Sequence, residues 1–166
     1  LLFNLSAALH ITAYCVISRQ LVMKDGAPVF HTGEDDLQAF LTGAYRHLEV
    51  NYPKFHKMDN LSKLGWLATE FLLKGRTMAD DYAPAEVGVV LANASSSLDT
   101  DLRYYETTHD IASPALFVYT LPNIVMGEIC IRHAFKGENA FFVQPELDPV
   151  FLEQYVANLM NNNILQ

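Results

Sequence analysis

The chain has 166 residues, of which 51% are hydrophobic and 18% charged, with a formal net charge of −8. This composition argues against a disordered chain, which would be polar and highly charged, and the acidity argues against nucleic acid as a partner, because phosphate binding needs clustered Lys and Arg. The length fits one domain over residues 1–166, and the apolar fraction is high enough that part of it is expected to cover a partner surface.

The first third of the chain predicts one strand and two helices. Residues 11–17 are apolar on both faces, which predicts a buried strand at the centre of a parallel sheet. A turn is expected at 24–26, and residues 27–32 are expected to be extended or loop. Asp35 and Asp36 begin the first helix, and Asp59 or Asn60 caps the second, which ends at Gly75. The apolar stripe of the first helix is Leu37, Leu41, Ala44 and Leu48, and that of the second is Leu61, Leu64, Ala68, Phe71 and Leu72.

The middle of the chain predicts a loop, a strand and a capped helix. Asp80 and Asp81 lie in a loop with no third ligand nearby in sequence, so we expect a solvated turn and no metal site. Residues 87–91 predict a second buried parallel strand. Residues 93–101 form a Ser-rich turn, which either caps a helix through Ser97 and Asp99 or binds an anion through free N–H groups.

The last third predicts a helix, a strand and a final helix. Pro122 opens the helix and Gly137 ends it, with a buried stripe of Ile124, Gly127, Ile131, Ala134 and Phe135. Residues 140–143 predict a short strand buried on both faces, and Asp148 followed by Pro149 caps the last helix. We therefore expect an α/β domain with a mostly parallel sheet and helices on both faces.

The two cysteines and the six histidines show no catalytic or metal-binding spacing. Cys15 and Cys130 lie in apolar segments and are predicted to be buried thiols. The histidines are scattered, at positions 10, 31, 47, 56, 109 and 133, so we expect no cofactor and no metal. No apolar run approaches the roughly 20 residues that span a bilayer, and the first ten residues lack the positive region of a signal peptide. We therefore expect a cytoplasmic protein with no membrane partner.

Several motifs occur in the order found in one enzyme family. They are Met58-Asp59, residues 61–64, residues 86–93, Ser113-Pro114, Leu121-Pro122-Asn123, Gly127, Ile131-Arg132, Phe135-Lys136-Gly137 and Asn139. Together with residues 11–18 they resemble the N-terminal half of the β-ketoacyl-acyl-carrier-protein synthases of the thiolase superfamily. The resemblance implies the first half of a thiolase-like fold, in which the strand before the nucleophile pairs with its copy in a dimer. We accordingly expect residues 141–144 to pair across a two-fold axis.

The catalytic residues of that family are not matched. Counting from Gly137, the position of the nucleophilic Cys falls at Glu146, with Gln144 close before it. A carboxylate is a poor substitute for a thiolate in forming an acyl thioester. The family's two catalytic histidines lie in its second half, which this chain does not contain. The candidates for pocket lining are Phe117, Tyr119, Asn123, Ile124 and Phe142, and ordinary core packing is the alternative for the aromatic ones.

Three functions are open on these grounds. The first is a non-catalytic ketosynthase-like scaffold or chain-length partner in fatty-acid or polyketide biosynthesis, a pseudoenzyme beside an active synthase or in a homodimer. The second is part of a synthase that another chain completes, and the third is an acyl- or small-ligand-binding module. An acyl carrier protein is a further candidate partner, for which Arg132, His133 and Lys136 form the one basic patch in view.

Overall fold

The computed structural model describes residues 9–33 and 35–166. The strands are β1 (Cys15–Ser18), β2 (Leu21–Lys24), β3 (Ala27–His31), β4 (Val89–Asn93) and β5 (Asn139–Val143). The helices are α1 (Leu37–His47), α2 (Asn60–Leu73), α3 (Leu98–Thr107), α4 (Pro114–Val118), α5 (Ile124–His133) and α6 (Pro149–Asn161), with short 3-10 turns η1 (Pro53–Lys57), η2 (Met78–Asp80) and η3 (Pro84–Glu86). Among the described residues, no helix is long and apolar enough to cross a membrane.

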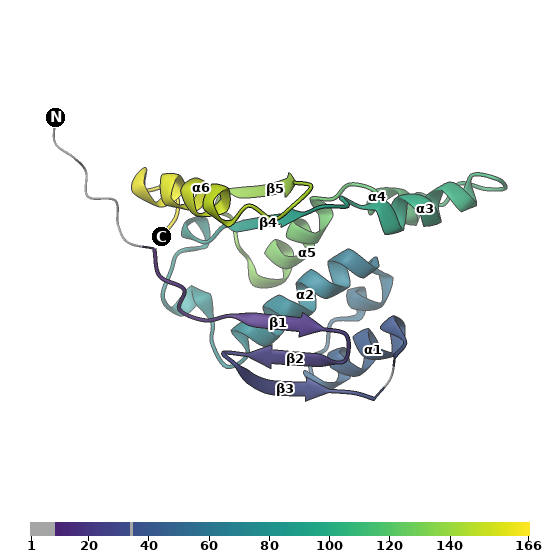
Figure 1. Ribbon diagram of the computed structural model, residues 1–166, viewed down its shortest axis with the longest axis horizontal. Helices are drawn as coiled ribbons and strands as arrows, with labels where there is room; N and C mark the ends of the chain where they lie inside the picture. The colour runs from purple at the N-terminus through teal and green to yellow at the C-terminus, as the bar shows by residue number, and fades with distance from the viewer. Residues whose placement is uncertain (1–8, 34) are drawn as a thin grey trace.

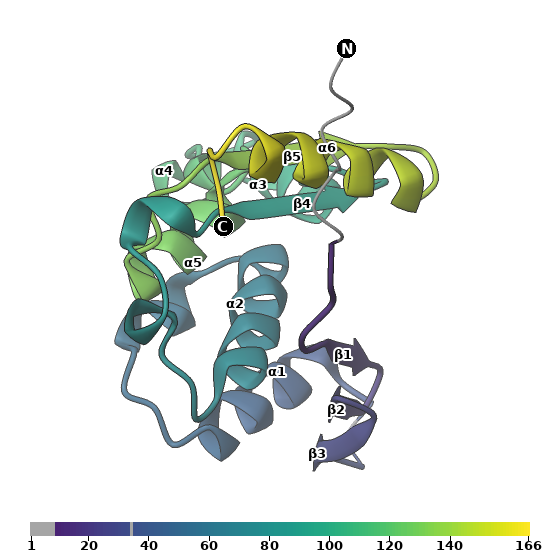
Figure 2. The same cartoon turned by 90° about the vertical axis from the view of Figure 1, so that its left-hand side faces the viewer.

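The elements stack in layers, two of which are small sheets with helices between them (Figures 1 and 2). An antiparallel sheet in the order β1-β2-β3 lies on one side, and α1 and α2 pack beside it. Helix α5 lies between α2 and a second sheet, in which β4 and β5 run parallel. Helix α6 covers the other face of this sheet, where Phe142 meets Phe151 and Tyr155 edge to face. Helix α2 therefore lies near the middle of the stack.

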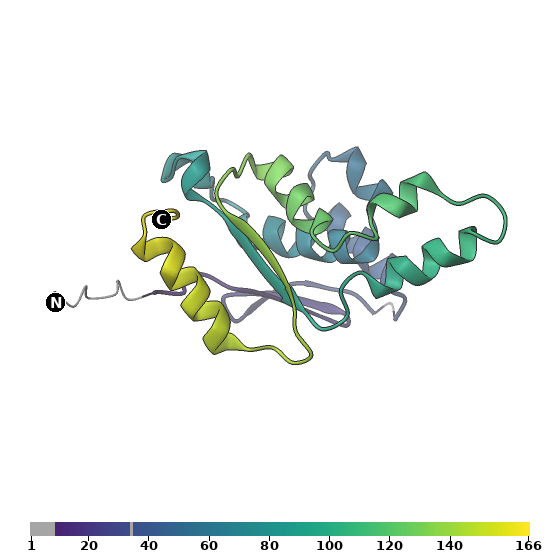
Figure 3. The same cartoon turned by 90° about the horizontal axis from the view of Figure 1, so that it is seen from above.

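Helices α3 and α4 with their connection form an arm, residues 98–121, that extends sideways from the end of β4 (Figure 3). The ring of Tyr104 on α3 lies 5.5 Å from that of Phe117 on α4, and Ser113 N donates to Thr107 Oγ1 at the turn. At the base of the arm, Thr100 Oγ1 donates to Asp59 Oδ2 at 2.9 Å. The arm is thus braced internally and anchored to the N-terminus of α2.

The prediction of a central parallel strand over residues 11–17 is wrong. The strand begins at Cys15 and lies at the edge of an antiparallel sheet, with Val16 exposed. The cause is a pair of tight turns: Arg19-Gln20 closes a hairpin between β1 and β2, and Asp25-Gly26, with φ angles of 50° and 81°, closes a second one between β2 and β3. Asp25 Oδ1 also accepts a hydrogen bond from N of Tyr14, the residue before β1, which places the start of β1 beside the Asp25-Gly26 turn.

The expected sheet of mostly parallel strands is therefore replaced by two sheets. Strand β2 was not expected, and residues 27–31 form a strand in spite of Pro28, because β3 is an edge strand on which the missing N–H costs little. Strands β4 and β5 make a parallel pair, in the register Val89 with Asn139 to Asn93 with Val143.

Three of the predicted helix starts are confirmed by their caps. Asp36, Asp59 and Asp148 each accept a hydrogen bond from the backbone N–H three residues later, at 2.7, 3.0 and 2.9 Å. Of the two candidate caps of the second helix, Asp59 and Asn60, Asp59 is the N-cap. At the Ser-rich turn, Ser97 is the first residue before α3, but its hydroxyl donates to the Thr120 carbonyl and does not cap the helix.

Helix α5 differs from the prediction at both ends and in its buried face. It begins at Ile124, after the N-cap Asn123, and not at Pro122. Ala134, with φ 58°, adopts the left-handed conformation that was expected of Gly137. The buried residues are Val125, Met126, Glu128 and Ile129, whereas Ile131 is 67% exposed. The prediction placed only apolar residues on the buried face, whereas the structure also buries the carboxylate of Glu128. Lys54 and Tyr119 pair with this carboxylate, which makes its burial possible.

The two halves of the chain are buried to very different degrees. The main core lies in the first half and contains Val22, Phe40, Leu41, Ala44, Tyr45, Leu48, Phe55, Met58, Trp66, Leu67 and Phe71. The second cluster of buried residues is formed by Val125, Met126 and Ile129 of α5. All five residues of β4 are half-buried, and α3 and α6 bury little more than Thr100 and Leu159.

Two glycines in helix interiors test the packing of α2 on α5. A β-carbon at Gly65 would lie 2.5 Å from Cγ2 of the buried Val125, whereas one at Gly127 would meet nothing within 4 Å. We expect Gly65→Ala to lower the free energy of unfolding by about 1 kcal/mol, because overpacking outweighs the better helix propensity. The control Gly127→Ala should raise it by about 0.5–1 kcal/mol. Urea denaturation followed by circular dichroism measures both, and equal effects would contradict the close contact.

Candidate functional site

The carboxyl ends of β4 and β5 lie side by side, which is where parallel sheets commonly hold ligands. After β4, the side chain of Asn93 accepts from Ser96 N and donates to the Ser96 carbonyl, so the turn is closed on itself. The first turn of α3 carries Asp99 and Asp101, whose charge repels anions. The turn is therefore held by its own hydrogen bonds, and the two acids beside it disfavour anion binding.

After β5, the residues predicted to replace the catalytic ones lie in an open turn. Residues 144–149 line a hollow of about 530 Å³, and Glu146 is exposed within it. Gln144 N donates to the Asn93 carbonyl and continues the ladder of β4 and β5, while Gln144 Oε1 accepts from Asp148 N at 3.4 Å. The assignment of Glu146 to the nucleophile position remains a prediction.

The predicted lining residues lie in different parts of the molecule. Phe117 is 55% exposed on the arm, and Asn123 is exposed at the start of α5. Ile124 is half-buried in the first turn of α5, whereas Phe142 packs against α6 on the other face of the sheet. The structure does not bring Phe117 and Phe142 together, and their role as a pocket lining stays a prediction.

Tyr119 belongs to a polar contact that links the arm to the body. Its hydroxyl donates to Glu128 Oε1 at 3.0 Å, and Lys54 Nζ lies 2.8 Å from Glu128 Oε2. Burial, followed by the hydrogen bond to Glu128, raises the pKa of Tyr119 far above its ordinary value of 10.0. Tyr119 is therefore a neutral anchor that joins the arm to α5.

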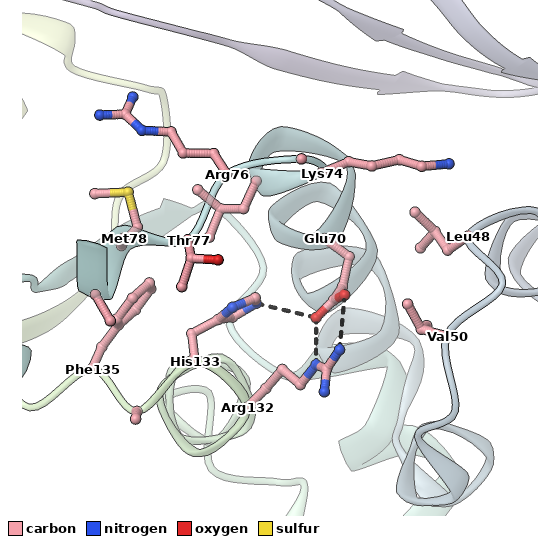
Figure 4. Close-up of a pocket in the computed structure, with 14 residues that line it drawn as sticks. Leu48, Val50, Glu70, Lys74, Arg76, Thr77, Met78, Arg132, His133 and Phe135 are labelled. Carbon is pink, nitrogen blue, oxygen red and sulfur yellow. Dashed lines mark hydrogen bonds and ion pairs between the residues drawn. The ribbon is translucent and has the colours of Figure 1, made fainter. Parts of the chain in front are cut away.

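The cavity in Figure 4 holds a second buried carboxylate. It has a volume of about 450 Å³ and is lined by α2, the loop from Lys74 to Ala79 and the end of α5. Arg132 Nε donates to Glu70 Oε1 at 2.7 Å, with a second, longer bond from its terminal nitrogen to Oε2. His133 Nε2 lies 3.2 Å from the same Oε1, and its ring stacks on Phe135.

The charge of Glu70 is fixed by these neighbours. Burial by itself would raise the pKa of Glu70, but His133 and the bonds from Arg132 outweigh it and hold that pKa below its ordinary value of 4.5. The hydrogen bond to Glu70 likewise raises the pKa of Arg132. Arg132 and His133 therefore point inward to Glu70, so the basic patch expected with Lys136 is not a free cationic surface.

Sequence reasoning missed Glu70 and Glu128 because each lies in a mainly apolar helix. A signal was present: Glu70 follows Trp66 and Leu67 within a buried stripe of α2, and Arg132 lies near the end of the mainly apolar α5. Pairing them requires knowledge of which helices meet, since the two residues are 62 positions apart.

Both cysteines are half-buried rather than buried. Burial raises the pKa of each thiol, which disfavours the nucleophilic thiolate. Cys15 borders an apolar cleft of about 380 Å³ between α2 and β4, lined also by Ala68, Leu72, Val90 and Ile129. Within residues 9–33 and 35–166, no three His, Cys, Asp or Glu side chains gather as a metal site.

One solved structure, described as "The ishigamide ketosynthase/chain length factor", is similar to this chain. The TM-score is 0.55 and the sequence identity 25%, over 66% of this chain and 32% of that chain. The chain thus spans about a third of the length of that protein. No protein-family model matches the sequence, and no curated protein matches it. The chain has a ketosynthase-like fold.

The Glu70 pair yields a test of stability. We expect Arg132→Met to lower the free energy of unfolding at pH 7 by about 2–3 kcal/mol, because it leaves a buried carboxylate without its main partner. The control Arg76→Met breaks the exposed pair with Asp81 and should cost less than about 0.5 kcal/mol. Urea denaturation compares the two, and equal losses would contradict the inward pairing.

The same pair predicts a pH dependence. Because the pKa of Glu70 is lowered in the folded state, its contribution is complete above pH 4.5 and is lost as the pH falls through the lower folded value. Glu70→Gln should be less stable at pH 7 and should lack this part of the acid dependence. A variant that keeps the wild-type slope below pH 4.5 would show that Glu70 is not the titrating group.

Proposed function

We propose that this chain is a non-catalytic ketosynthase-like subunit, a scaffold or chain-length partner beside an active ketosynthase in polyketide or fatty-acid biosynthesis. The similarity to a ketosynthase/chain length factor supports the fold on which this rests. Fold alone does not determine function, so the proposal depends on the surface and on the candidate site.

The observation that carries the proposal is the apolar surface of the second half of the chain. Most of the large apolar side chains that are exposed in the described part belong to residues 86–166. They are Leu98, Leu102, Tyr105, Ile111, Phe117, Val118, Leu121, Ile131, Val143, Leu147, Val150, Phe151 and Ile164. A surface with so many apolar side chains is typical of a protein that is covered by other polypeptide in its working state.

The candidate site supports a role without catalysis. The hollow after β5 is lined by residues 144–149, which include neither a cysteine nor a histidine. Glu146 is exposed to solvent there. A carboxylate that attacked an acyl thioester would form an anhydride, which is higher in energy than the thioester that a cysteine forms. The subunit would thus contribute surface to the assembly and leave the condensation to its partner.

Strand β5 is the element through which such a subunit would pair. It bonds β4 on one side, and no described strand pairs with its other edge. A short unpaired edge with apolar side chains is a ready site for strand addition. The proposal places a ketosynthase-like chain there, or a second copy, with an acyl carrier protein as a further partner.

Reconstitution tests the proposal. An active ketosynthase of the same organism is assayed for condensation of malonyl carrier protein with and without this chain, and the products are separated by mass spectrometry. We expect the chain alone to be inactive, and its addition to change the rate or the length of the products. A ketosynthase that neither binds the chain nor changes its products would contradict the proposal.

Two variants at the nucleophile position separate a scaffold from an enzyme completed by another chain. Glu146→Gln should leave the reconstituted turnover within about twofold, whereas a catalytic carboxylate would lose about 100-fold or more. Glu146→Cys should create no condensing activity in the isolated chain, because no histidine lines the hollow after β5. Activity from that single change would overturn both the half-fold interpretation and the scaffold role.

The apolar cleft beside Cys15 favours a second candidate, an acyl-binding module. This candidate predicts that dodecanoate binds the isolated chain with a Kd below about 100 µM, as measured by calorimetry. Ala68→Phe, which fills the cleft, should weaken binding at least about tenfold. Ala115→Phe, at an exposed position of α4, is the control. Absence of binding would remove this candidate.

A further inference from the structure

The negative charge of the chain is concentrated in the half that exposes its apolar side chains. Residues 86–166 contain ten Asp and Glu against three Lys and Arg, whereas residues 1–85 contain nine against eight. Glu128 is the one buried acid among them, and most of the other acids of this half are exposed. Exposed apolar side chains and acidic residues are therefore both concentrated in the same half of the chain.

The arm shows this combination most clearly. Leu98, Leu102 and Tyr105 recur along α3 at the spacing of one helix face, and they are 51%, 59% and 59% exposed. Residues 98–121 also contain four acids, Asp99, Asp101, Glu106 and Asp110, against one cation, Arg103. The arm extends away from the body, so neither sheet covers it (Figure 3).

The arm is prepared for docking before any partner arrives. The shape of the arm is held by the ring contact between α3 and α4 and by the hydrogen bond from Ser113 N to Thr107. Its base is held by the hydrogen bond from Thr100 to Asp59. Ser97 and Tyr119 add two more anchors, through the Thr120 carbonyl and Glu128. A rigid element loses little conformational entropy when it binds, which favours a specific interface.

We infer that the arm docks on a different protein chain, whose contact surface is apolar and bordered by Lys and Arg. This inference rests on the proposed function and specifies the chemistry of the partner. The inference is based on charge complementarity. The apolar stripe of α3 lies near the acids Glu106 and Asp110, so a complementary surface would be apolar with cations at its rim.

A second copy of this chain fits the arm poorly. A symmetric dimer through the arms would bring the acids of both arms together, between chains that each carry a net charge of −8. Like charges in such an arrangement oppose association, most strongly at low ionic strength. The arm is therefore expected to select a basic partner over self-association.

Binding measurements with the purified ketosynthase as the probe test this inference. Light scattering should show a heteromer of the chain with the ketosynthase, and the arm should mediate no self-association of the isolated chain. Leu102→Ala with Tyr105→Ala should raise the Kd at least about tenfold. The matched control is Ile11→Ala with Val16→Ala, which removes two exposed apolar side chains of the first half and should change the Kd less than about twofold.

A charge variant tests the sign of the partner surface. Glu106→Gln with Asp110→Asn should weaken binding about threefold at 0.1 M salt and reduce the salt dependence between about 0.1 and 1 M, where the Debye length falls from about 10 to 3 Å. Circular dichroism of each variant verifies that α3 is intact. Binding that strengthens when these carboxylates are neutralised would overturn a basic partner surface.

The remaining outcomes separate the two proposals. If the Kd of the ketosynthase complex is unchanged in all arm variants, the arm is not the docking surface, whereas the proposed function is unaffected. A homodimer that dissociates with Leu102→Ala and Tyr105→Ala would overturn a different chain as the partner. No complex with the ketosynthase, under conditions in which both proteins are folded, would overturn the proposed function together with this inference.

Discussion

The close approach of α2 and α5 joins the two sheets into one molecule. At Gly65 the two helices come near enough that even a methyl group would collide with Val125, and one turn further along, Glu70 of α2 holds Arg132 of α5. The apolar contact sets the distance between the helices, and the ion pair sets their relative rotation, because its donors and acceptors must face each other. The position of β4 and β5, and hence of the arm and the open turn after β5, follows from this one contact.

Local chemistry made several parts of this structure predictable. The caps at Asp36, Asp59 and Asp148 act on the backbone three residues away, so their effect is visible in the sequence itself. The hairpin of β1 and β2 was missed because its two-residue turn, Arg19-Gln20, carries no Gly, Asn, Asp or Pro. The Asp25-Gly26 turn was recognised, but apolar residues before it suggested a central strand in place of a short edge strand.

The long-range polar pairs were beyond sequence reasoning. A buried Glu in an apolar helix looks like a misplaced surface residue until its partner is known, and Arg132 and Lys54 are far from their partners in sequence. The lining residues Phe117 and Phe142 were grouped because both are aromatic and near one family motif, yet the sheet separates α4 from α6. Side-chain type indicates what a residue can contact, whereas only the packing of the elements decides which contacts occur.

The uneven core has a consequence for the life of the chain in the cell. The first half holds Trp66, Phe40, Phe55 and Phe71 in a packed interior, while β4, α3 and α6 bury few side chains. Segments with few buried contacts open at lower free energy than the core does, and proteases cleave the opened form. An unassembled copy would therefore be degraded from its second half, and its abundance would follow the supply of whatever covers that surface.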